Sequence, residues 1–248
     1  MLHSIRLATR SRTSGWARQC KTRTALVDEF YRQGARLTSL SHLLWSDIVR
    51  PGDTVLDATC GNGFDSVVLA RLCGRQGNVL CVDIQEQALA STKAHLESVI
   101  PLDERPHIEY IHESHCRLDH FVRPNSVGLI CFNAGYLPKG DHTLCTTAAT
   151  TRKALDAAAQ ALRPGGMLSV LCYIKQTGGT DECETVRSWM AALETEEFVC
   201  GHMEVLNRSQ GPQLFSAWKR DDVSEERRQR VAQKRARAKK KRETQNVC

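Results

Sequence analysis

The stretch VLDATCGNGFD, residues 55–65, decides the fold, because in it an apolar run ends in a glycine-flanked turn that carries carboxylates. A strand that feeds such a turn and then a helix is typical of nucleotide-binding α/β proteins, since glycine lets the backbone approach the ligand closely. A second apolar run, VLCVDIQ at residues 79–85, ends in Asp83. An acid in this position can accept hydrogen bonds from ribose hydroxyls. The two stretches together predict a site for a nucleoside cofactor.

Length and composition indicate a soluble globular protein, with one α/β domain as the expected organisation and two small domains as the alternative. The chain has 248 residues, of which 41% are hydrophobic and 25% charged. No apolar run approaches the roughly 18 residues that cross a bilayer, so we expect no membrane span. The eleven cysteines are scattered without a Cys-x-x-Cys pair. We therefore expect buried, reduced thiols and a reducing compartment, without a metal site or a disulfide framework.

The basic residues are concentrated at the two ends of the chain. Residues 1–27 hold six basic residues and no acid, and residues 219–248 hold twelve basic and five acidic residues. Because the whole chain carries +6, residues 28–218 carry about −7. We divide the chain into a leader at 1–27, a domain at 28–219 and a tail at 220–248. The leader has the composition of a transit peptide for a mitochondrion or chloroplast, and the alternative is a basic arm on a cytoplasmic protein.

Helical and strand patterns alternate along the domain. The last two strands are separated by only seven residues, so they must pair antiparallel, whereas the earlier alternation predicts parallel strands with helices on both faces. The predicted fold is a Rossmann-like α/β fold with a seven-stranded sheet, the pattern of S-adenosylmethionine-dependent methyltransferases. His42 and Trp45 are expected to pack on the first helix. The predicted helices cover residues 28–49, 64–73, 85–99, 147–162 and 180–193, and the strands cover 53–59, 78–83, 106–111, 126–132, 167–174, 198–206 and 214–219.

The sequence of the turn favours S-adenosylmethionine over a dinucleotide as the cofactor. A dinucleotide fingerprint needs a third glycine, and here residues 61–66 read GNGFDS. Asp57 and Asp65 flank the turn with negative charge, which would repel a pyrophosphate. The same carboxylates attract a cofactor that carries a cationic amino group and a sulfonium. We therefore expect S-adenosylmethionine at this site.

These motifs resemble those of the MnmM-like methyltransferases, also labelled rRNA methylases, which methylate the aminomethyl group on the wobble uridine of tRNA. The resemblance spans about residues 35 to 218 and rests on DATCGNGFD (57–65), DIQ (83–85), SH (114–115), FNAGYLPKGD (132–141) and PGG (164–166). This chain departs from the family pattern at Phe64, where the family usually has His, and at Ala134, where it usually has Leu. It also reads YIKQ at 173–176 and QGPQ at 210–213, where the family has Tyr-x-Gly-His and an Asn-x-Pro-Pro-type segment.

The motifs and the resemblance together give a set of candidate site residues. The resemblance implies that Asn133 and Tyr136 lie where methyl donor and acceptor meet, since Asn-x-x-Tyr is similar to the Asn-Pro-Pro-Tyr arrangement of amino-group methyltransferases. Asp141 is a further candidate, as an acceptor for the amine proton. Cys131 is expected to be buried and inert, which disfavours a covalent mechanism at a uridine carbon. The expected cofactor-binding residues are Asp57, Gly61, Asn62, Gly63, Asp65, Asp83, Gln85, Ser114 and His115.

An acidic domain that acts on RNA needs positive charge from elsewhere, because phosphate contacts supply much of the affinity for nucleic acids. The tail holds ten basic residues between Arg227 and Arg242 and is our candidate RNA contact. The expected function is N-methylation of the 5-aminomethyl group of the tRNA wobble uridine or 2-thiouridine. Two alternatives remain: a methyltransferase acting on rRNA or a small amine, and a non-catalytic RNA-binding protein with a methyltransferase-like fold. A homodimer remains open.

Overall fold

The computed structural model describes residues 30–32, 34–134, 146–176, 178–208 and 210–221. Tyr136, Asp141, the leader through residue 29 and the tail from residue 222 lie outside the described residues. The helices are α2 (Leu37–Ile48), α3 (Phe64–Cys73), α4 (Glu86–Val99), α5 (Ala148–Ala161) and α6 (Gly179–Ala191), with a 3₁₀ turn η1 (His115–His120). The strands are β1 (Thr54–Asp57), β2 (Asn78–Asp83), β3 (His107–His112), β4 (Val127–Ala134), β5 (Leu162–Tyr173), β6 (Phe198–Met203) and β7 (Pro212–Lys219).

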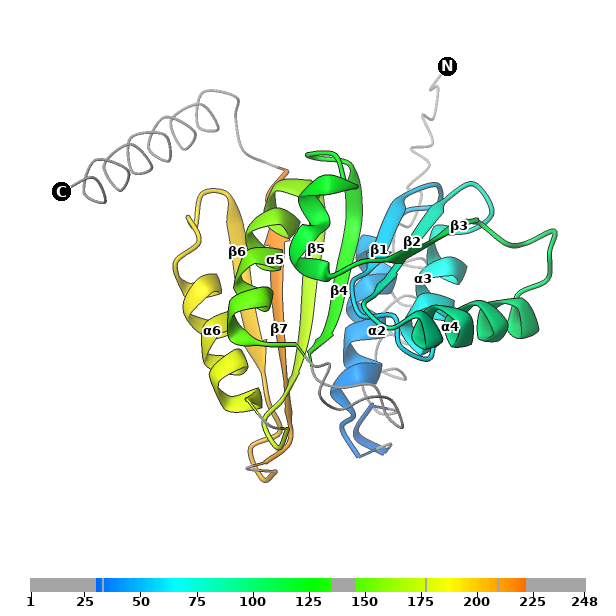
Figure 1. Ribbon diagram of the computed structural model, residues 1–248. Helices are drawn as coiled ribbons and strands as arrows, with labels where there is room; N and C mark the ends of the chain where they lie inside the picture. Colours follow the sequence, from blue (N-terminus) through cyan, green and yellow to red (C-terminus); the bar gives the residue numbers. More distant parts are fainter. Residues whose placement is uncertain (1–29, 33, 135–145, 177, 209, 222–248) are drawn as a thin grey trace, which may run out of the picture.

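The seven strands form one sheet in the order β3-β2-β1-β4-β5-β7-β6 (Figure 1). The first five strands run parallel, and β7 lies antiparallel between β5 and β6. The predicted seven-stranded sheet and its C-terminal antiparallel pair are confirmed. Strand β7 can enter between β5 and β6 because a short turn reverses the chain after β6.

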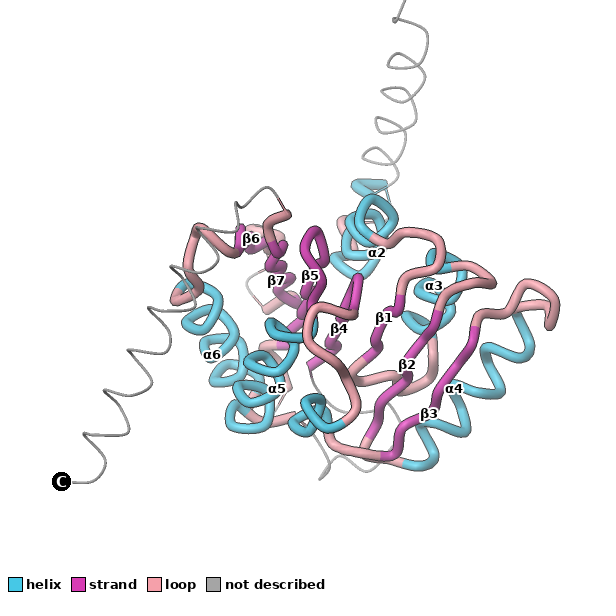
Figure 2. The backbone as a smooth tube through the Cα atoms, turned by 90° about the horizontal axis from the view of Figure 1, so that it is seen from above, coloured by secondary structure: helices cyan, strands magenta, loops and turns pink. Residues whose placement is uncertain are grey.

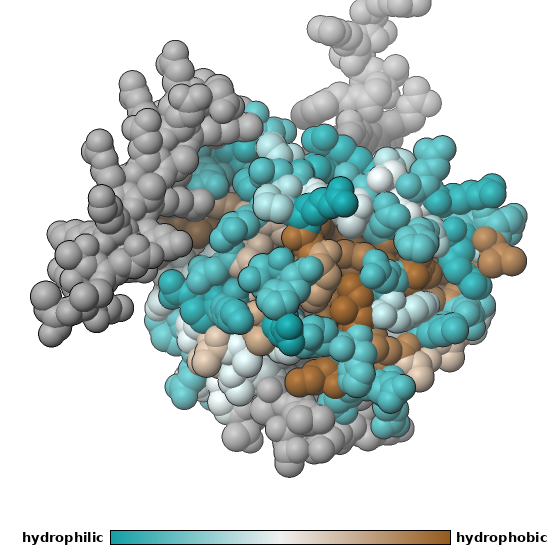
Figure 3. Space-filling model, turned by 45° about the horizontal axis from the view of Figure 1, so that its top comes forward, coloured by the Kyte–Doolittle hydropathy of each residue, from teal (hydrophilic) through white to brown (hydrophobic). Residues whose placement is uncertain are grey.

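Helices cover both faces of the sheet, as predicted (Figure 2). One core lies between the sheet and helices α5 and α6, and includes Leu155, Trp189 and Phe215. The other core lies between the sheet and helices α2, α3 and α4, and includes Trp45, Leu69 and Leu96. Because strands β1, β2 and β4 are buried on both faces, their sequences are continuous apolar runs instead of alternating ones. Figure 3 shows a patch of hydrophobic side chains near the middle of this face, surrounded by hydrophilic side chains.

Several predicted boundaries differ from the structure, such as the strand over 198–206, which ends at Met203, and two of these differences have local backbone reasons. The helix expected over 28–49 is interrupted at Gly34 and Ala35, which both have positive φ, and α2 begins only at Leu37. Strand β5 begins at Leu162 instead of residue 167, because residues 163–166 form a bulge opposite β4, with Gly165 at φ +73°. Within the described residues, no helix is both long and apolar enough to span a membrane.

Candidate active site

The predicted cofactor turn lies at the carboxyl edge of the sheet, where strands β1, β2 and β4 end side by side. The strand order changes direction between β1 and β4, since β2 and β3 lie on one side of β1 and later strands on the other. Open α/β sheets bind ligands at such a switch point, outside the carboxyl ends of the strands. The structure therefore brings the motifs after β1, β2 and β4 together at the expected place.

The turn needs glycine at two positions. Gly61 and Gly63 have φ of +51° and +78°, a region that residues with a side chain rarely adopt. A Cβ on Gly63 would also lie 2.9 Å from the Cα of Thr92, so the turn packs directly against helix α4. Helix α3 begins at Phe64, immediately after this turn. Its free N–H groups thus face the edge where the ligand is expected.

Side chains of helix α4 donate hydrogen bonds to the carbonyl groups of the turn. Thr92 Oγ1 donates to the carbonyl oxygens of Gly61 and Cys60, at 3.0 and 3.3 Å. Ser91 Oγ donates to Asn62 Oδ1 at 3.1 Å, and His95 Nδ1 donates to the Asn62 carbonyl at 3.0 Å. No sequence motif indicates this role for α4, because it depends on the packing of α4 against the turn. Exposed Phe64 stacks edge-on against His95, with ring centroids 5.0 Å apart.

Asp83 joins the ends of β1 and β2. Its Oδ2 accepts the Gly61 N–H and its Oδ1 accepts the Gln85 N–H, both at 3.0 Å. Burial raises the pKa of Asp83, and these two donors partly offset that effect. A carboxylate oxygen accepts more than one hydrogen bond, so each oxygen retains capacity for a ribose hydroxyl.

Asp57 lies beneath the turn and is 1% exposed. Its Oδ2 accepts the Ser66 hydroxyl at 2.6 Å and its Oδ1 accepts the Thr59 N–H at 3.3 Å. Burial and the nearby charge of Asp65 raise the pKa of Asp57 to about 7, although the bonds from Ser66 and Thr59 act in the opposite direction. The observed contacts of Asp57 thus support the turn, and its contact with the cofactor stays a prediction.

His115 presents a buried ring nitrogen at the cofactor side of the site. Ser114 caps the 3₁₀ turn that begins at His115, and the imidazole meets Phe132 edge-on at 5.9 Å. Burial lowers the pKa of His115 to about 4, so the ring is neutral near pH 7. Its Nε2 has no hydrogen-bond partner among the described residues. A buried unpaired nitrogen is unfavourable, and a polar ligand beside it would relieve that cost. This site therefore fits a nucleoside cofactor.

Asp65 links helix α3 to two other elements. It is 6% exposed, its Oδ1 lies 2.6 Å from His42 Nε2, and its Oδ2 accepts the Asn133 side-chain amide. The Asn133 backbone N–H donates to Thr59 Oγ1 at 2.7 Å. His42, expected only to pack on its helix, therefore reaches the site, and neither His42 nor Thr59 was among the expected site residues. The helical spacing of α2 indicated which face is apolar but not what His42 would meet.

Tyr173, at the end of β5, lies on the same side as Asp65. Its hydroxyl hydrogen-bonds the Thr38 side chain of α2, and burial together with the charge of Asp65 raises its pKa. Cys131, two residues before Asn133, is 1% exposed, and burial and the charges of Asp57 and Asp65 raise its pKa well above the usual range. The thiol is therefore protonated and a poor nucleophile, as expected.

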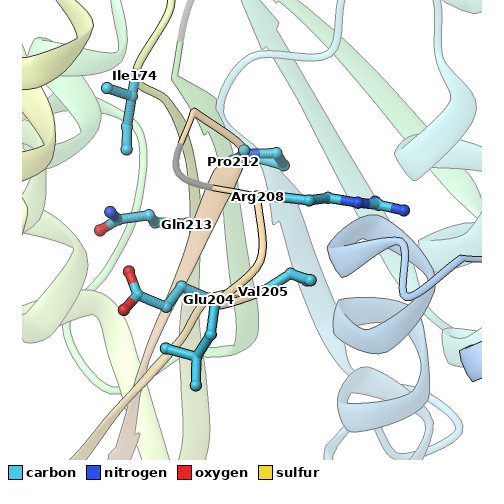
Figure 4. Close-up of a pocket in the computed structure, with 8 residues that line it drawn as sticks. Ile174, Glu204, Val205, Arg208, Pro212 and Gln213 are labelled. Atoms are coloured by element: carbon cyan, nitrogen blue, oxygen red, sulfur yellow. The ribbon is translucent and has the colours of Figure 1, made fainter.

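A small pocket opens at the same edge, between the end of β5 and the turn that joins β6 to β7 (Figure 4). Its lining includes Ile174, Glu204, Val205, Arg208, Pro212 and Gln213. The Arg208 side chain extends from the turn toward α2. Its guanidinium lies 3.1 Å from the position that a Cβ would take on Gly34, which precedes α2. Pro212 pairs with Tyr173 across the β5–β7 ladder, so the pocket adjoins the Asp65 side of the site.

All nine expected cofactor residues lie at the carboxyl edge of the sheet, on the segment from β1 to α3, at the end of β2 and after β3, and their contact with the cofactor stays a prediction. Of the expected catalytic residues, Asn133 joins them through Asp65, and the roles of Tyr136 and Asp141 stay predictions. Among the described residues no group of three or more metal-ligating side chains occurs, and the cysteines there are free. Six of those eight cysteines are buried, as expected.

Comparison with known proteins identifies the family of this chain. The family described as "Putative rRNA methylase" matches residues 79–219. A protein of Arabidopsis thaliana named "tRNA (mnm(5)s(2)U34)-methyltransferase, chloroplastic" is 34% identical over 195 residues, which cover 75% of this chain and 70% of that protein.

Two solved bacterial structures share the fold at similar identity. A "putative rRNA-methylase" of Clostridium thermocellum is 34% identical, with a TM-score of 0.68 over 73% of this chain and 96% of that one. "SMU.1697c, a putative methyltransferase" of Streptococcus mutans was solved in complex with SAH; it is 30% identical, with a TM-score of 0.65 over 74% of this chain and 98% of that one. The chain belongs to the rRNA methylase family and is an S-adenosylmethionine-dependent methyltransferase.

Proposed function

We propose that this protein methylates the 5-aminomethyl nitrogen of the wobble uridine, or 2-thiouridine, of tRNA. The observation that carries the proposal is the 34% identity, over three quarters of the chain, to a plant protein named for methylation at U34 of tRNA. The side chain at the end of β4 supports an amine acceptor, because the Asn133 amide donates to Asp65 and leaves its carbonyl oxygen to accept.

The residues of the turn and of β2 would hold the cofactor. Asp83 would accept hydrogen bonds from the ribose hydroxyls, and the Gly61–Gly63 turn would bring its backbone against the ligand. The neutral ring of His115 would offer Nε2 for a hydrogen bond with the cofactor. When bound, S-adenosylmethionine supplies a methyl carbon to the amine lone pair, leaving the electrons of the broken carbon–sulfur bond on sulfur, with one amine proton released. Asp65, together with the ionised form of Asp57, would place negative charge beside the positive cofactor.

On the acceptor side, the residues must bind a neutral amine and orient it. Asn133 Oδ1 would accept one amine N–H, so that the nitrogen lone pair points toward the methyl carbon. Tyr136 would stack on the base, and Asp141 would take the released proton. A covalent route through Cys131 is disfavoured, because this thiol is buried and protonated.

The RNA would be bound partly by the ten basic residues between Arg227 and Arg242. The acid-free leader and the chloroplast location in the name of the Arabidopsis relative support import into an organelle. The family description favours one alternative substrate, rRNA. Membership of a methyltransferase family sets aside the non-catalytic alternative.

Nucleoside mass spectrometry tests the proposal and separates the two RNAs. In cells that lack the protein, the wobble position of tRNA should accumulate unmethylated aminomethyluridine, and re-expression of the wild type should reverse this. Re-expression of Asp83→Ala should not reverse it, whereas Asp103→Ala, in an exposed turn, is the matched acidic control. Normal tRNA together with a missing methyl group in rRNA would overturn the tRNA assignment.

A further inference from the structure

We propose that His42 is a positioning residue that acts through Asp65 to orient the amide of Asn133 toward the methyl acceptor. The inference rests on the proposed amine-methylating function and extends it to a residue of helix α2. The three side chains come from α2, α3 and β4 and form one continuous chain of hydrogen bonds. Nothing in the motifs after the strands includes His42, because α2 precedes the cofactor turn in the sequence.

The direction of each bond follows from the chemistry of Asp65. An ionised carboxylate can only accept, so both of its neighbours must donate. His42 therefore carries a hydrogen on Nε2, 2.6 Å from Oδ1, and Asn133 turns its NH₂ group toward Oδ2. The opposite orientation of the amide would place its carbonyl oxygen against the carboxylate. With Nδ2 held by Asp65, Asn133 Oδ1 points away from the carboxylate and is oriented as an acceptor.

The surroundings of the chain keep each member in place. The His42 ring packs against Trp45, which is 2% exposed, with centroids 4.8 Å apart. Asp65 is buried in the first turn of α3 and packs between α2 and the sheet. The Asn133 backbone is tied to Thr59 of the cofactor turn by the 2.7 Å bond to Oγ1. A residue whose backbone and side-chain nitrogen are both held has little freedom to turn its amide.

An amine acceptor makes this orientation matter. A neutral primary amine presents two N–H donors and one lone pair, and only an acceptor beside it can hold an N–H while the lone pair faces the methyl carbon. An Asn133 amide turned the other way would offer donors, which would compete for the lone pair that must react. His42 thus helps to orient the amine for methyl transfer once both substrates are bound. It should contribute little to cofactor binding.

The kinetic test compares three substitutions of His42 with a control. His42→Gln can place its amide nitrogen near the position of Nε2, whereas His42→Asn is too short to reach Asp65. We expect kcat on aminomethyluridine RNA to fall at least about 10-fold in His42→Ala and His42→Asn and to recover to within about 3-fold in His42→Gln. The S-adenosylmethionine Kd should stay within about 2-fold by calorimetry. His107→Ala, an exposed histidine at the start of β3, should leave kcat unchanged.

A double-mutant cycle separates positioning from general support of the fold. If His42 acts through Asn133, His42→Ala should have almost no further effect on kcat in an Asn133→Ala background. Equal reductions of kcat in the two backgrounds, or a lower melting temperature with unchanged kcat, would overturn the proposal.

A spectroscopic test needs no RNA and therefore does not depend on the proposed function. In protein labelled with ¹⁵N-asparagine, the Asn133 side-chain signal, identified by its loss in Asn133→Ala, should show one proton shifted downfield and protected from exchange. This signature should disappear in His42→Ala and persist in His42→Gln. An unchanged signal in His42→Ala would overturn the positioning role. Absence of turnover by the wild type, with the signature present, would instead count against the proposed substrate.

Discussion

The carboxylate of Asp83 accepts the backbone N–H of Gly61 at 3.0 Å, and this bond ties the end of β2 to the turn after β1. The same carboxylate accepts the Gln85 N–H, so one side chain fixes both segments that flank the expected ribose position. Asp83 therefore has two functions that a substitution would remove together: it shapes the turn and it would bind the cofactor.

Replacing Asp83 by alanine should strongly weaken cofactor binding. A hydrogen bond to a charged group contributes about 1.5–3 kcal/mol, so removal of two hydrogen bonds to the ribose should raise the S-adenosylmethionine Kd by about 100-fold or more. Isothermal titration calorimetry measures this directly. Asp103→Ala should bind like the wild type, and unchanged affinity in Asp83→Ala would remove this residue from the cofactor site.

Gly63→Ala should destabilise the protein through both its backbone and its packing. The position has φ +78°, and a Cβ there would lie 2.9 Å from the Cα of Thr92, which is backbone and cannot move aside. We expect a loss of about 1–3 kcal/mol in the free energy of unfolding, measured with urea. Gly178→Ala is the matched control, since Gly178 is also a left-handed residue before a helix, with φ +76°, but has nothing within 4 Å of the Cβ position. A similar loss in both variants would mean that contact with α4 is unimportant.

The fold and the cofactor side could be predicted largely from sequence, because both depend on local signals. Apolar runs mark the buried strands, and the glycines and Asp83 mark a turn whose chemistry depends on a few neighbouring residues. The acceptor side depends on contacts between distant segments: Asp65 meets His42 across 23 positions and Asn133 across 68. Helical periodicity indicates that a face of α2 is buried but not which side chain of α3 lies opposite it. The support of the turn by Thr92 and His95 was missed for the same reason.

His115 should make stability fall in mild acid. Its folded pKa of about 4 lies below the usual value of 6.5, so between these values the unfolded chain binds a proton that the folded protein does not. Lowering the pH from 8 to 5 should therefore reduce the free energy of unfolding of the wild type by about 2 kcal/mol more than that of His115→Gln, in which this titration is absent.

The raised pKa of Asp57 has the opposite effect, since the folded protein then holds a proton that the unfolded chain has released. Comparison of the two proteins at each pH cancels this contribution, because Asp57 is present in both. Chemical denaturation at pH 5, 6, 7 and 8 gives the difference. Parallel stability curves for wild type and His115→Gln would show that the imidazole is protonated as easily in the folded state as in the unfolded state.

Deletion of residues 222–248 should weaken RNA binding and leave cofactor binding intact. The ten basic residues between Arg227 and Arg242 are the largest concentration of positive charge in the chain, and the domain itself carries about −7. Removal of one interaction with a phosphate should reduce the slope of log K against log salt concentration by about 0.7 to 0.9. Fluorescence anisotropy with a labelled tRNA, at salt concentrations from 50 to 200 mM, about the range over which such interactions change affinity most clearly, gives both quantities. A variant with the ten basic residues changed to glutamine keeps the tail length and should match the deletion, whereas unchanged affinity and slope in both would exclude the tail as an RNA contact.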